Sequence, residues 1–392
     1  MRAALYRDMG EAAEVFCVEE VDRPEPGPGE VLVRVHASGV NPTDYKARSG
    51  AVPRPIDDYQ IPHQDGAGVI EAVGAGVDSG RVGERVWLWL AAAGRRCGTA
   101  AEWTTVPARQ AVTLPDGASF ELGASLGVPA MTAHYCLFAD GPVTGQTVLV
   151  AGGAGAVGHF AIELAKRAGA RVVTTVSSPD KAALAEKAGA DLVVNYRSPD
   201  AADQVRAFGP VDRVIEVALG ANLQLDLATA GPHATIVTYT AEPANPELPV
   251  RACMTANLTL KFVLLYGVEM TALDQAAADI TAALAAGELT GLPVHKYPLA
   301  DIAAAHQAAE SGTVLRSNYK WLAIYQLLLF LPITVGMAAV LLIPKDTVSH
   351  RVLFTVSQAA LPDWLVAVVA VCGAAAAMVP AAAISMGISS LL

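Results

Sequence analysis

The sequence has no cluster of basic residues. Its 27 lysines and arginines are outnumbered by 38 aspartates and glutamates, and the formal net charge is −11 at pH 7. Binding to nucleic acid requires clustered cations that neutralise the phosphates. We therefore expect no nucleic-acid partner.

Cysteine is scarce, and no two cysteines are closely spaced. The five stand far apart and none forms a Cys-x-x-Cys pair: Cys17, Cys97, Cys136, Cys253 and Cys372. Disulfide frameworks and zinc lobes have regular, closely spaced thiols, so the pattern predicts reduced structural cysteines. The first sixteen residues, "MRAALYRDMGEAAEVF", lack the long apolar segment of a signal peptide. We therefore expect the N-terminal part to stay in the cytoplasm.

Two kinds of secondary-structure pattern divide the chain. Up to about residue 115, short strand patterns such as "EVLVRVHASGV" alternate with turns such as "PEPGPGE". From "TVLVAG" onward, strands and helices alternate, which predicts right-handed crossovers and a parallel sheet with helices on both faces. We predict an α/β protein with a β-rich domain up to about residue 115, followed by a doubly wound domain.

The first strand-to-helix turn of the second domain contains a glycine motif. In "VLVAGGAGAVGHFAIELAK", Gly153, Gly155 and Gly158 form G-x-G-x-x-G, with Ala156 and Val157 between the last two. Such glycines permit a tight turn and the close approach of a pyrophosphate, which the helix N-terminus stabilises. A glycine triplet can also be an ordinary turn, but the strand–turn–helix context favours a dinucleotide site.

The end of the following strand indicates which dinucleotide binds. An NAD site needs an acidic residue there, about twenty residues after the motif, to bind the ribose hydroxyls. The strand instead ends "VVTTVSSPDK", with Ser177 and Ser178 at its tip and Lys181 one helical turn later. The serines can also serve as helix caps. A cation and two hydroxyls without an acid favour the 2′-phosphate of NADPH.

Taken together, several segments resemble the medium-chain dehydrogenase/reductase superfamily, in its zinc-independent quinone oxidoreductase (zeta-crystallin-like) branch. They are "GEVLVRVHASGVNPTDYKARSG", "DGAGVIEAVG", "GERVW", "TAHYCL", the glycine loop, "GADLVVNYR" and "AAHQAAESGTV". The resemblance runs from Met1 to about Val314. It implies a GroES-like β domain over residues 1–120, completed by about 285–315, and a Rossmann domain over residues 121–284 that binds NADPH. We also expect a homodimer.

The resemblance also implies individual site residues. Asn41 and Asp44 would lie in the catalytic cleft with Tyr45 beside them, and Asn41 could bind the acceptor carbonyl as negative charge develops there. For Asp44 and Tyr45, hydrogen bonding at a strand end is the alternative. Around the cofactor, the resemblance places Thr132 near the nicotinamide, and Tyr196 and Lys181 at the 2′-phosphate.

Zinc ligands are missing from the expected positions. Zinc-dependent members of the superfamily carry cysteine where this chain has Asn41, and histidine where it has Gln64. Amides are poor zinc ligands, and His63 is one position out of register, so we interpret it as a loop histidine and expect no metal. Without a Lewis acid, the substrate must accept hydride readily by itself. We predict an NADPH-dependent quinone oxidoreductase; the alternatives are an enone or enoyl-thioester reductase, and a transporter component with a non-catalytic NADPH-binding domain.

Charged residues disappear from two long segments near the C-terminus. Residues 321–343 and 364–392 contain no Asp, Glu, Lys or Arg. As a helix the first would be about 35 Å long, enough to cross a bilayer core of about 30 Å. A buried helix of a soluble protein is the alternative for either segment.

We predict a transmembrane hairpin over residues 321–392, which resembles a fragment of a sodium:solute symporter. It would hold the protein at the membrane with the reductase on the cytoplasmic side. The junction indicates a fusion, either natural or produced by a gene-model error; in the second case the protein would be cytoplasmic.

Overall fold

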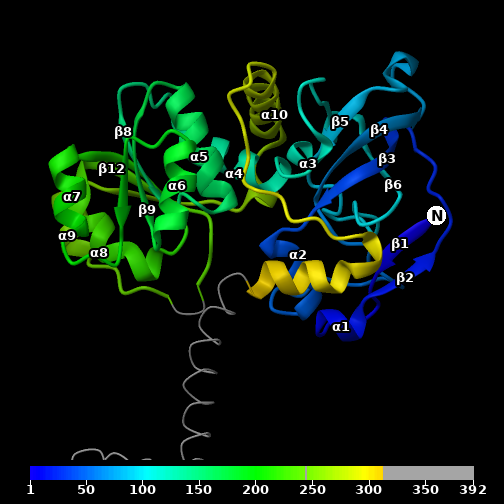
Figure 1. The fold of residues 1–392 in the computed structure, drawn as a ribbon, viewed down its shortest axis with the longest axis horizontal. Coiled ribbons are helices and arrows are strands. Elements are labelled where there is room, and N and C mark those ends of the chain that lie inside the picture. The colour runs from blue at the N-terminus through cyan, green and yellow to red at the C-terminus, as the bar shows by residue number, and fades with distance from the viewer. Residues whose placement is uncertain (243–244, 312–392) are drawn as a thin grey trace, which may run out of the picture. The chain divides into compact units, whose positions relative to one another are not determined.

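The structure, a computed structural model, describes residues 1–242 and 245–311 (Figure 1). The predicted transmembrane hairpin and the junction before it lie outside these residues. Within the described part, no helix combines the length and the apolar character needed to cross a membrane.

The first sheet is antiparallel and has five strands in the order β6-β3-β4-β5-β7. Glycine lets β4 pack closely against β3, because a Cβ at Gly68 would lie 2.0 Å from the Arg34 carbonyl oxygen. Beside this sheet, β1 (Arg2–Leu5) pairs with β2 (Cys17–Glu20). The five strands are β3 (Glu30–Gly39), β4 (Asp65–Val73), β5 (Arg85–Leu88), β6 (Trp103–Pro107) and β7 (Ala111–Thr113).

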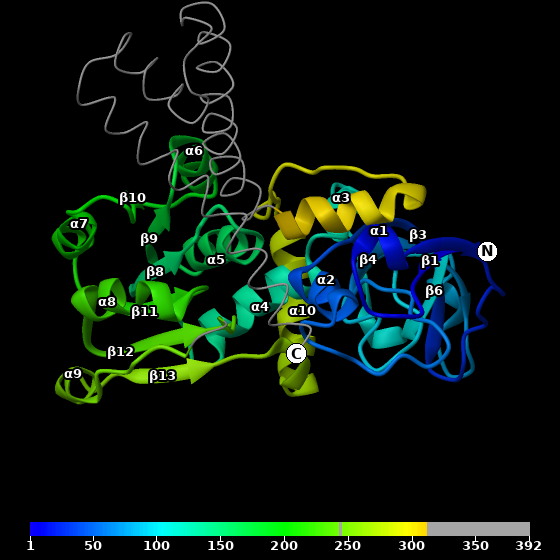
Figure 2. The ribbon, with the colours of Figure 1, turned by 90° about the horizontal axis from the view of Figure 1, so that it is seen from below.

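The second sheet is parallel, as the alternation of strands and helices predicted (Figure 2). Its six strands have the order β10-β9-β8-β11-β12-β13. All five residues of β8 are buried because helices cover both faces. One apolar cluster includes α4 and α5, and another includes α7 and α8. The strands are β8 (Thr147–Ala151), β9 (Arg171–Val176), β10 (Leu192–Asn195), β11 (Val211–Glu216), β12 (Ala230–Thr238) and β13 (Thr259–Phe262).

Helices connect successive strands of the second sheet. Two more helices follow the last strand, α10 and a helix over residues 302–311. The labelled helices of this half are α3 (Phe120–Gly123), α4 (Gly127–Phe138), α5 (Ala156–Arg167), α6 (Pro179–Lys187), α7 (Ala201–Phe208), α8 (Leu219–Thr229), α9 (Val250–Thr255) and α10 (Met270–Ala285). Short 3-10 turns are η1 (Ser79–Arg81), η2 (Ala108–Gln110), η3 (Leu265–Gly267) and η4 (Leu299–Asp301).

Two helices occur in the first part of the chain, where the sequence suggested only strands: α1 (Ala12–Val15) and α2 (Pro42–Ser49). Helix α2 begins with Asn41 as its N-cap and proline at its first position, and it ends at Gly50 with φ of 83°. These are favourable start and stop residues. The helix was missed because its eight residues show no strong apolar repeat.

Candidate active site

The parallel sheet gathers the predicted dinucleotide residues at the carboxyl ends of β8, β9 and β10. Gly155 is the N-cap of α5, and Ala156 and Val157 form the first turn of this twelve-residue helix. The helix N-terminus presents unpaired backbone N–H groups and the positive end of the helix dipole. This is the arrangement that holds a pyrophosphate.

The glycines of the turn have different structural roles. Gly152, which the sequence analysis did not single out, has φ of +70° and makes the tight turn. A Cβ at Gly153 would lie 2.1 Å from Thr174 Oγ1, and one at Gly158 would lie 2.4 Å from the Gly152 carbonyl oxygen. At Gly155 the only atom within 4 Å would be that same oxygen, at 3.2 Å. Gly153 and Gly158 are therefore required by packing, whereas Gly155 is exposed at the open end of the loop.

The residues predicted at the 2′-phosphate meet at the ends of β9 and β10. Ser178 is the N-cap of α6, and its Oγ accepts a hydrogen bond from the Lys181 backbone N–H at 3.4 Å. Ser178 therefore does serve as a helix cap, the alternative role that the sequence suggested for the serines. The Tyr196 N–H donates to the Val176 carbonyl at 3.1 Å, which brings Tyr196 to the tip of β9 beside Ser177. The side chains of Lys181 and Tyr196 are exposed.

A second cation at this edge was missed by the sequence analysis. Arg197 follows Tyr196 directly, and its guanidinium carbon lies 5.7 Å from the Tyr196 ring centroid. The sequence "NYR" directly after a strand could have indicated that Arg197 lies at the proposed 2′-phosphate site, because residues that follow parallel strands meet at one edge of the sheet. Thr132, predicted near the nicotinamide, is buried on α4, one turn after Val128.

On the other sheet, three acid and amide side chains form one buried cluster. The Asn41 N–H donates to Asp44 Oδ2 at 2.7 Å, and Asn41 Nδ2 donates to Asp65 Oδ2 at 2.8 Å. Both Asp65 oxygens also lie 2.9 Å from the Val128 nitrogen, so Asp65 accepts the first-turn N–H of α4. This approach needs glycine at 127, because a Cβ there would lie 2.1 Å from Asp65 Oδ1.

Burial shifts the proton affinity of both acids. It raises the pKa of Asp44 to about 7, although the Asn41 N–H, the Arg54 cation and the His63 backbone all act to lower it. It raises the pKa of Asp65 to about 8 against the hydrogen bonds from Asn41 and Val128. A carboxyl group with a pKa near 7 can hold and release a proton at neutral pH.

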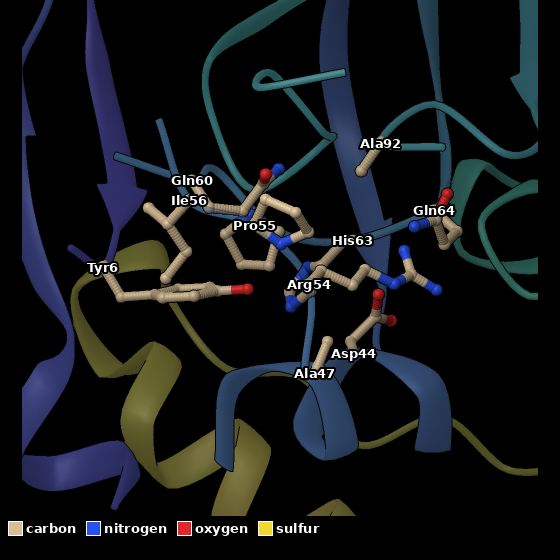
Figure 3. A pocket seen from close by; sticks show the side chains of 11 residues that line it. Tyr6, Asp44, Ala47, Arg54, Pro55, Ile56, Gln60, His63, Gln64 and Ala92 are labelled. Atoms are coloured by element: carbon tan, nitrogen blue, oxygen red, sulfur yellow. The ribbon is translucent and has the colours of Figure 1, made fainter. Parts of the chain in front are cut away.

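Asp44 lines a small pocket (Figure 3). Its volume is about 30 Å³, room for roughly two water molecules. The wall consists of Tyr6, Asp44, Ala47, Arg54, Pro55, Ile56, Gln60, Pro62, His63, Gln64 and Ala92.

Three polar lining residues, Tyr6, Arg54 and Gln60, were missed by the sequence analysis. Tyr6 comes from the end of the first strand, and Arg54 comes from the loop after α2. The Arg54 guanidinium lies 5.0 Å from the ring centroid of Tyr266, whose hydroxyl donates to Thr43 Oγ1 at 2.8 Å. No local pattern marks these residues, because the site forms only when distant segments meet. Of the predicted catalytic residues, Asn41 and the half-buried Tyr45 do not line the pocket.

The donor atoms near the pocket do not suit zinc. The Asn41 amide donates to Asp65, and both Asp65 oxygens are occupied by N–H donors. Gln64 is an amide, and across residues 1–242 and 245–311 there is no group of three His, Cys, Asp or Glu side chains able to hold a metal ion. A zinc site needs at least three such ligands.

Two family descriptions match the chain. "Alcohol dehydrogenase GroES-like domain" matches residues 27–116, and "Zinc-binding dehydrogenase" matches residues 156–281. The human quinone oxidoreductase is 30% identical over 318 residues, which are 80% of this chain and 95% of the relative. The pig quinone oxidoreductase is 32% identical over 293 residues, 74% of this chain and 87% of the relative.

Solved structures show the same similarity. A mycobacterial structure complexed with NADPH is 31% identical with a TM-score of 0.69, and covers 79% of this chain and 97% of its own. The Escherichia coli quinone oxidoreductase complexed with NADPH is 26% identical with a TM-score of 0.70, and covers 80% of this chain and 97% of its own.

Proposed function

The chain belongs to the medium-chain dehydrogenase/reductase superfamily, among the quinone oxidoreductases, and on this basis we propose that it reduces quinones with NADPH. The observation that carries the proposal is the edge formed by β8, β9 and β10. The N-terminus of α5 is placed to bind the pyrophosphate. Hydroxyls and cations near the tip of β9, where no acid stands, are placed to bind the 2′-phosphate. We also propose that the boundaries between the GroES-like domain and the Rossmann domain lie near residues 120 and 284.

We assign the cofactor to the residues gathered at this edge. Bound NADPH supplies the hydride. The glycine turn and the first turn of α5 hold the pyrophosphate, and the exposed polar groups bind the 2′-phosphate. In order along the chain, the assigned residues of this edge are Gly153, Gly155, Ala156, Val157, Gly158, Ser177, Ser178, Lys181 and Tyr196. Thr132, which lies on α4, is assigned to the nicotinamide end of the cofactor.

We propose that the buried acid cluster supplies the proton that quinone reduction requires. Reduction of a quinone to a hydroquinone adds one hydride and, for a neutral product, one proton. Asp44 lines the pocket and has a pKa of about 7, so it can carry that proton at neutral pH. Asn41 holds the Asp44 carboxyl through its backbone N–H, and Tyr45 belongs to the same helix. The reaction is proposed to need no zinc.

The purified full-length chain tests this function with an acceptor panel. We expect NADPH oxidation with 1,4-benzoquinone that is faster than with an enone or an enoyl thioester, that survives chelators, and that is weaker with NADH. A higher rate with the enone or thioester would favour a reductase of conjugated carbonyls. NADPH binding without oxidation in the presence of any acceptor would contradict the enzyme and favour a non-catalytic domain.

We also propose that residues 321–392 attach the protein to a membrane, with the reductase on the cytoplasmic side. Two uncharged segments separated by a polar loop support this hairpin. Cell fractionation and labelling of Ser349→Cys test it. Full-length protein in the soluble fraction, or labelling only after lysis, would contradict it.

A homodimer is proposed through the edge strand β13. This strand pairs only with β12 on one side within the described sheet. Its neighbourhood exposes large apolar side chains: Phe262 is 73% exposed, Leu264 67% and Met254 68%. An unpaired apolar edge favours pairing with a second copy. Phe262→Lys should give monomers in light scattering if the proposal holds.

A further inference from the structure

A chain of hydrogen bonds that includes the pocket residue His63 runs from the helix after η4 to the start of β4. His63 and His306 meet through their Nε2 atoms at 2.9 Å, although they are 243 positions apart in the sequence. The other links are His63 Nδ1 with Ser38 Oγ at 2.7 Å, Ser38 Oγ with Thr99 Oγ1 at 2.8 Å, and Thr99 Oγ1 with the Asp65 carbonyl oxygen at 2.5 Å. His63, Thr99 and His306 are all buried.

The last link fixes the direction of every other hydrogen bond. A carbonyl can only accept, so the Thr99 hydroxyl donates to Asp65 and must accept from Ser38. Ser38 has then used its single hydrogen and must accept from His63 Nδ1–H. A neutral His63 with its proton on Nδ1 has a bare Nε2, and His306 must therefore donate from Nε2–H.

The surroundings keep both imidazoles neutral, as this assignment requires. Burial lowers the pKa of His63, and His306 lowers it further. Burial and the Arg48 cation lower the pKa of His306 to about 3. The Phe16 ring lies against His306 with 4.7 Å between ring centroids. His306 Nδ1 is buried with no hydrogen-bond partner among the described residues, which agrees with a proton on Nε2 alone.

His63 connects this chain of hydrogen bonds to the candidate catalytic acid. Its backbone has φ of 79°, a conformation that residues other than glycine rarely adopt. In this conformation its backbone N–H bonds Asp44 and lowers the pKa of that acid, while its side chain points back to Ser38 and His306. Two side-chain partners, together with the Thr99 N–H that donates to the His63 carbonyl at 3.1 Å, therefore hold a backbone conformation that would otherwise be unfavourable.

We propose that His306 is a positioning residue: its Nε2–H bond to His63 holds the His63 backbone against the Asp44 carboxyl. The proposal builds on the role given above to Asp44 in quinone reduction. His306, near the end of the reductase part of the chain, would thereby affect the pKa of Asp44 without contacting substrate or cofactor.

Two substitutions of His306 separate donation from packing. Glutamine can place an amide N–H near the position of Nε2–H, whereas leucine fills the space without a donor. Gln307→Leu is the control, because Gln307 is the exposed neighbour on the same helix. In the full-length chain, Asp44 is titrated by carboxyl ¹³C NMR, with its signal identified by its loss in Asp44→Asn. The kcat and the NADPH dissociation constant are measured alongside.

We expect His306→Leu to raise the pKa of Asp44 further, because the hydrogen bond that favours its charged form is lost. Its kcat should fall about tenfold with NADPH affinity unchanged, while His306→Gln and Gln307→Leu stay near wild type. An unchanged Asp44 pKa in a folded His306→Leu protein would overturn the proposal, as would a His306→Gln protein shifted as far as His306→Leu. Because the titration needs no turnover, it decides the proposal even if no quinone is reduced.

Discussion

The proposed cofactor edge, at the carboxyl ends of β8, β9 and β10, and the pocket lined by Asp44 are built in different ways. At the edge, Gly155, Ser178 and Tyr196 lie at or just after strand ends, and their neighbours in the sequence set their positions. In the pocket, Tyr6 and Asp44 are buried and come from segments far apart. Substitutions at the edge should therefore change mainly cofactor binding, whereas those in the pocket should change stability and activity together.

The largest effect is expected where the start of helix α4 packs against the antiparallel sheet. Gly127→Ala would place a Cβ 2.1 Å from Asp65 Oδ1 and 2.9 Å from the Leu88 carbonyl oxygen. The Asp65 carboxyl must then leave the Val128 N–H, and we expect a loss of about 4 kcal/mol in the free energy of unfolding. Urea denaturation measures it. Gly117→Ala, where nothing lies within 4 Å, is the control and should change little.

The second prediction concerns the pH dependence that Asp44 gives to the pocket. The ordinary pKa of an aspartate is 3.8, and below this pH Asp44 is protonated in both the folded and the unfolded protein. Between pH 3.8 and about pH 7, Asp44 has released its proton in the unfolded protein but still holds it in the folded protein. The folded state then binds more protons, so stability falls as the pH rises through this window, by up to roughly 4 kcal/mol.

Asp44→Asn isolates this contribution. The difference in unfolding free energy between wild type and variant, measured from pH 4 to pH 8, cancels the opposite effect of the buried histidines. We expect the wild type to lose stability relative to the variant up to about pH 7. A difference that does not vary with pH would show that Asp44 ionises normally in the folded protein.

At the cofactor edge, Gly155→Ala should act on binding alone. The backbone at Gly155 has φ of −85° and ψ of 161°, which alanine adopts without strain. The stability of the cofactor-free protein should therefore stay near wild type. The added methyl group stands at the open end of the turn, and we expect NADPH binding to weaken about tenfold. Fluorescence titration with NADPH and thermal melting together check this, and a large loss of stability would contradict it.

The smallest effect is expected at the exposed cation. Lys181→Ala should weaken NADPH binding about fivefold, because an exposed charge pair contributes only about 1 kcal/mol. The binding of NADH, which lacks the 2′-phosphate, should not change. Lys187→Ala removes an exposed lysine from the same helix and is the matched control. Equal weakening of NADPH and NADH by Lys181→Ala would argue against a 2′-phosphate site there.

Local sequence determined the parallel sheet and much of the cofactor edge. The alternation of strands and helices, the glycine turn and the serines after β9 depend on residues that are close along the chain. Their positions follow from helix and strand geometry and from the rule that parallel strands end at one edge. Even here, the identity of the glycine with positive φ, Gly152, emerged only from the folded turn.

Only the tertiary structure decided the acid pocket. Tyr6, Arg54 and His306 carry no local pattern, and their roles depend on which segments the sheets bring together. The sequence indicated a loop histidine at position 63, whereas folding buries this side chain against His306 and places its backbone at Asp44. Burial, which raises the pKa of Asp44, likewise results from the packing of distant segments, because only they remove water from the carboxyl group.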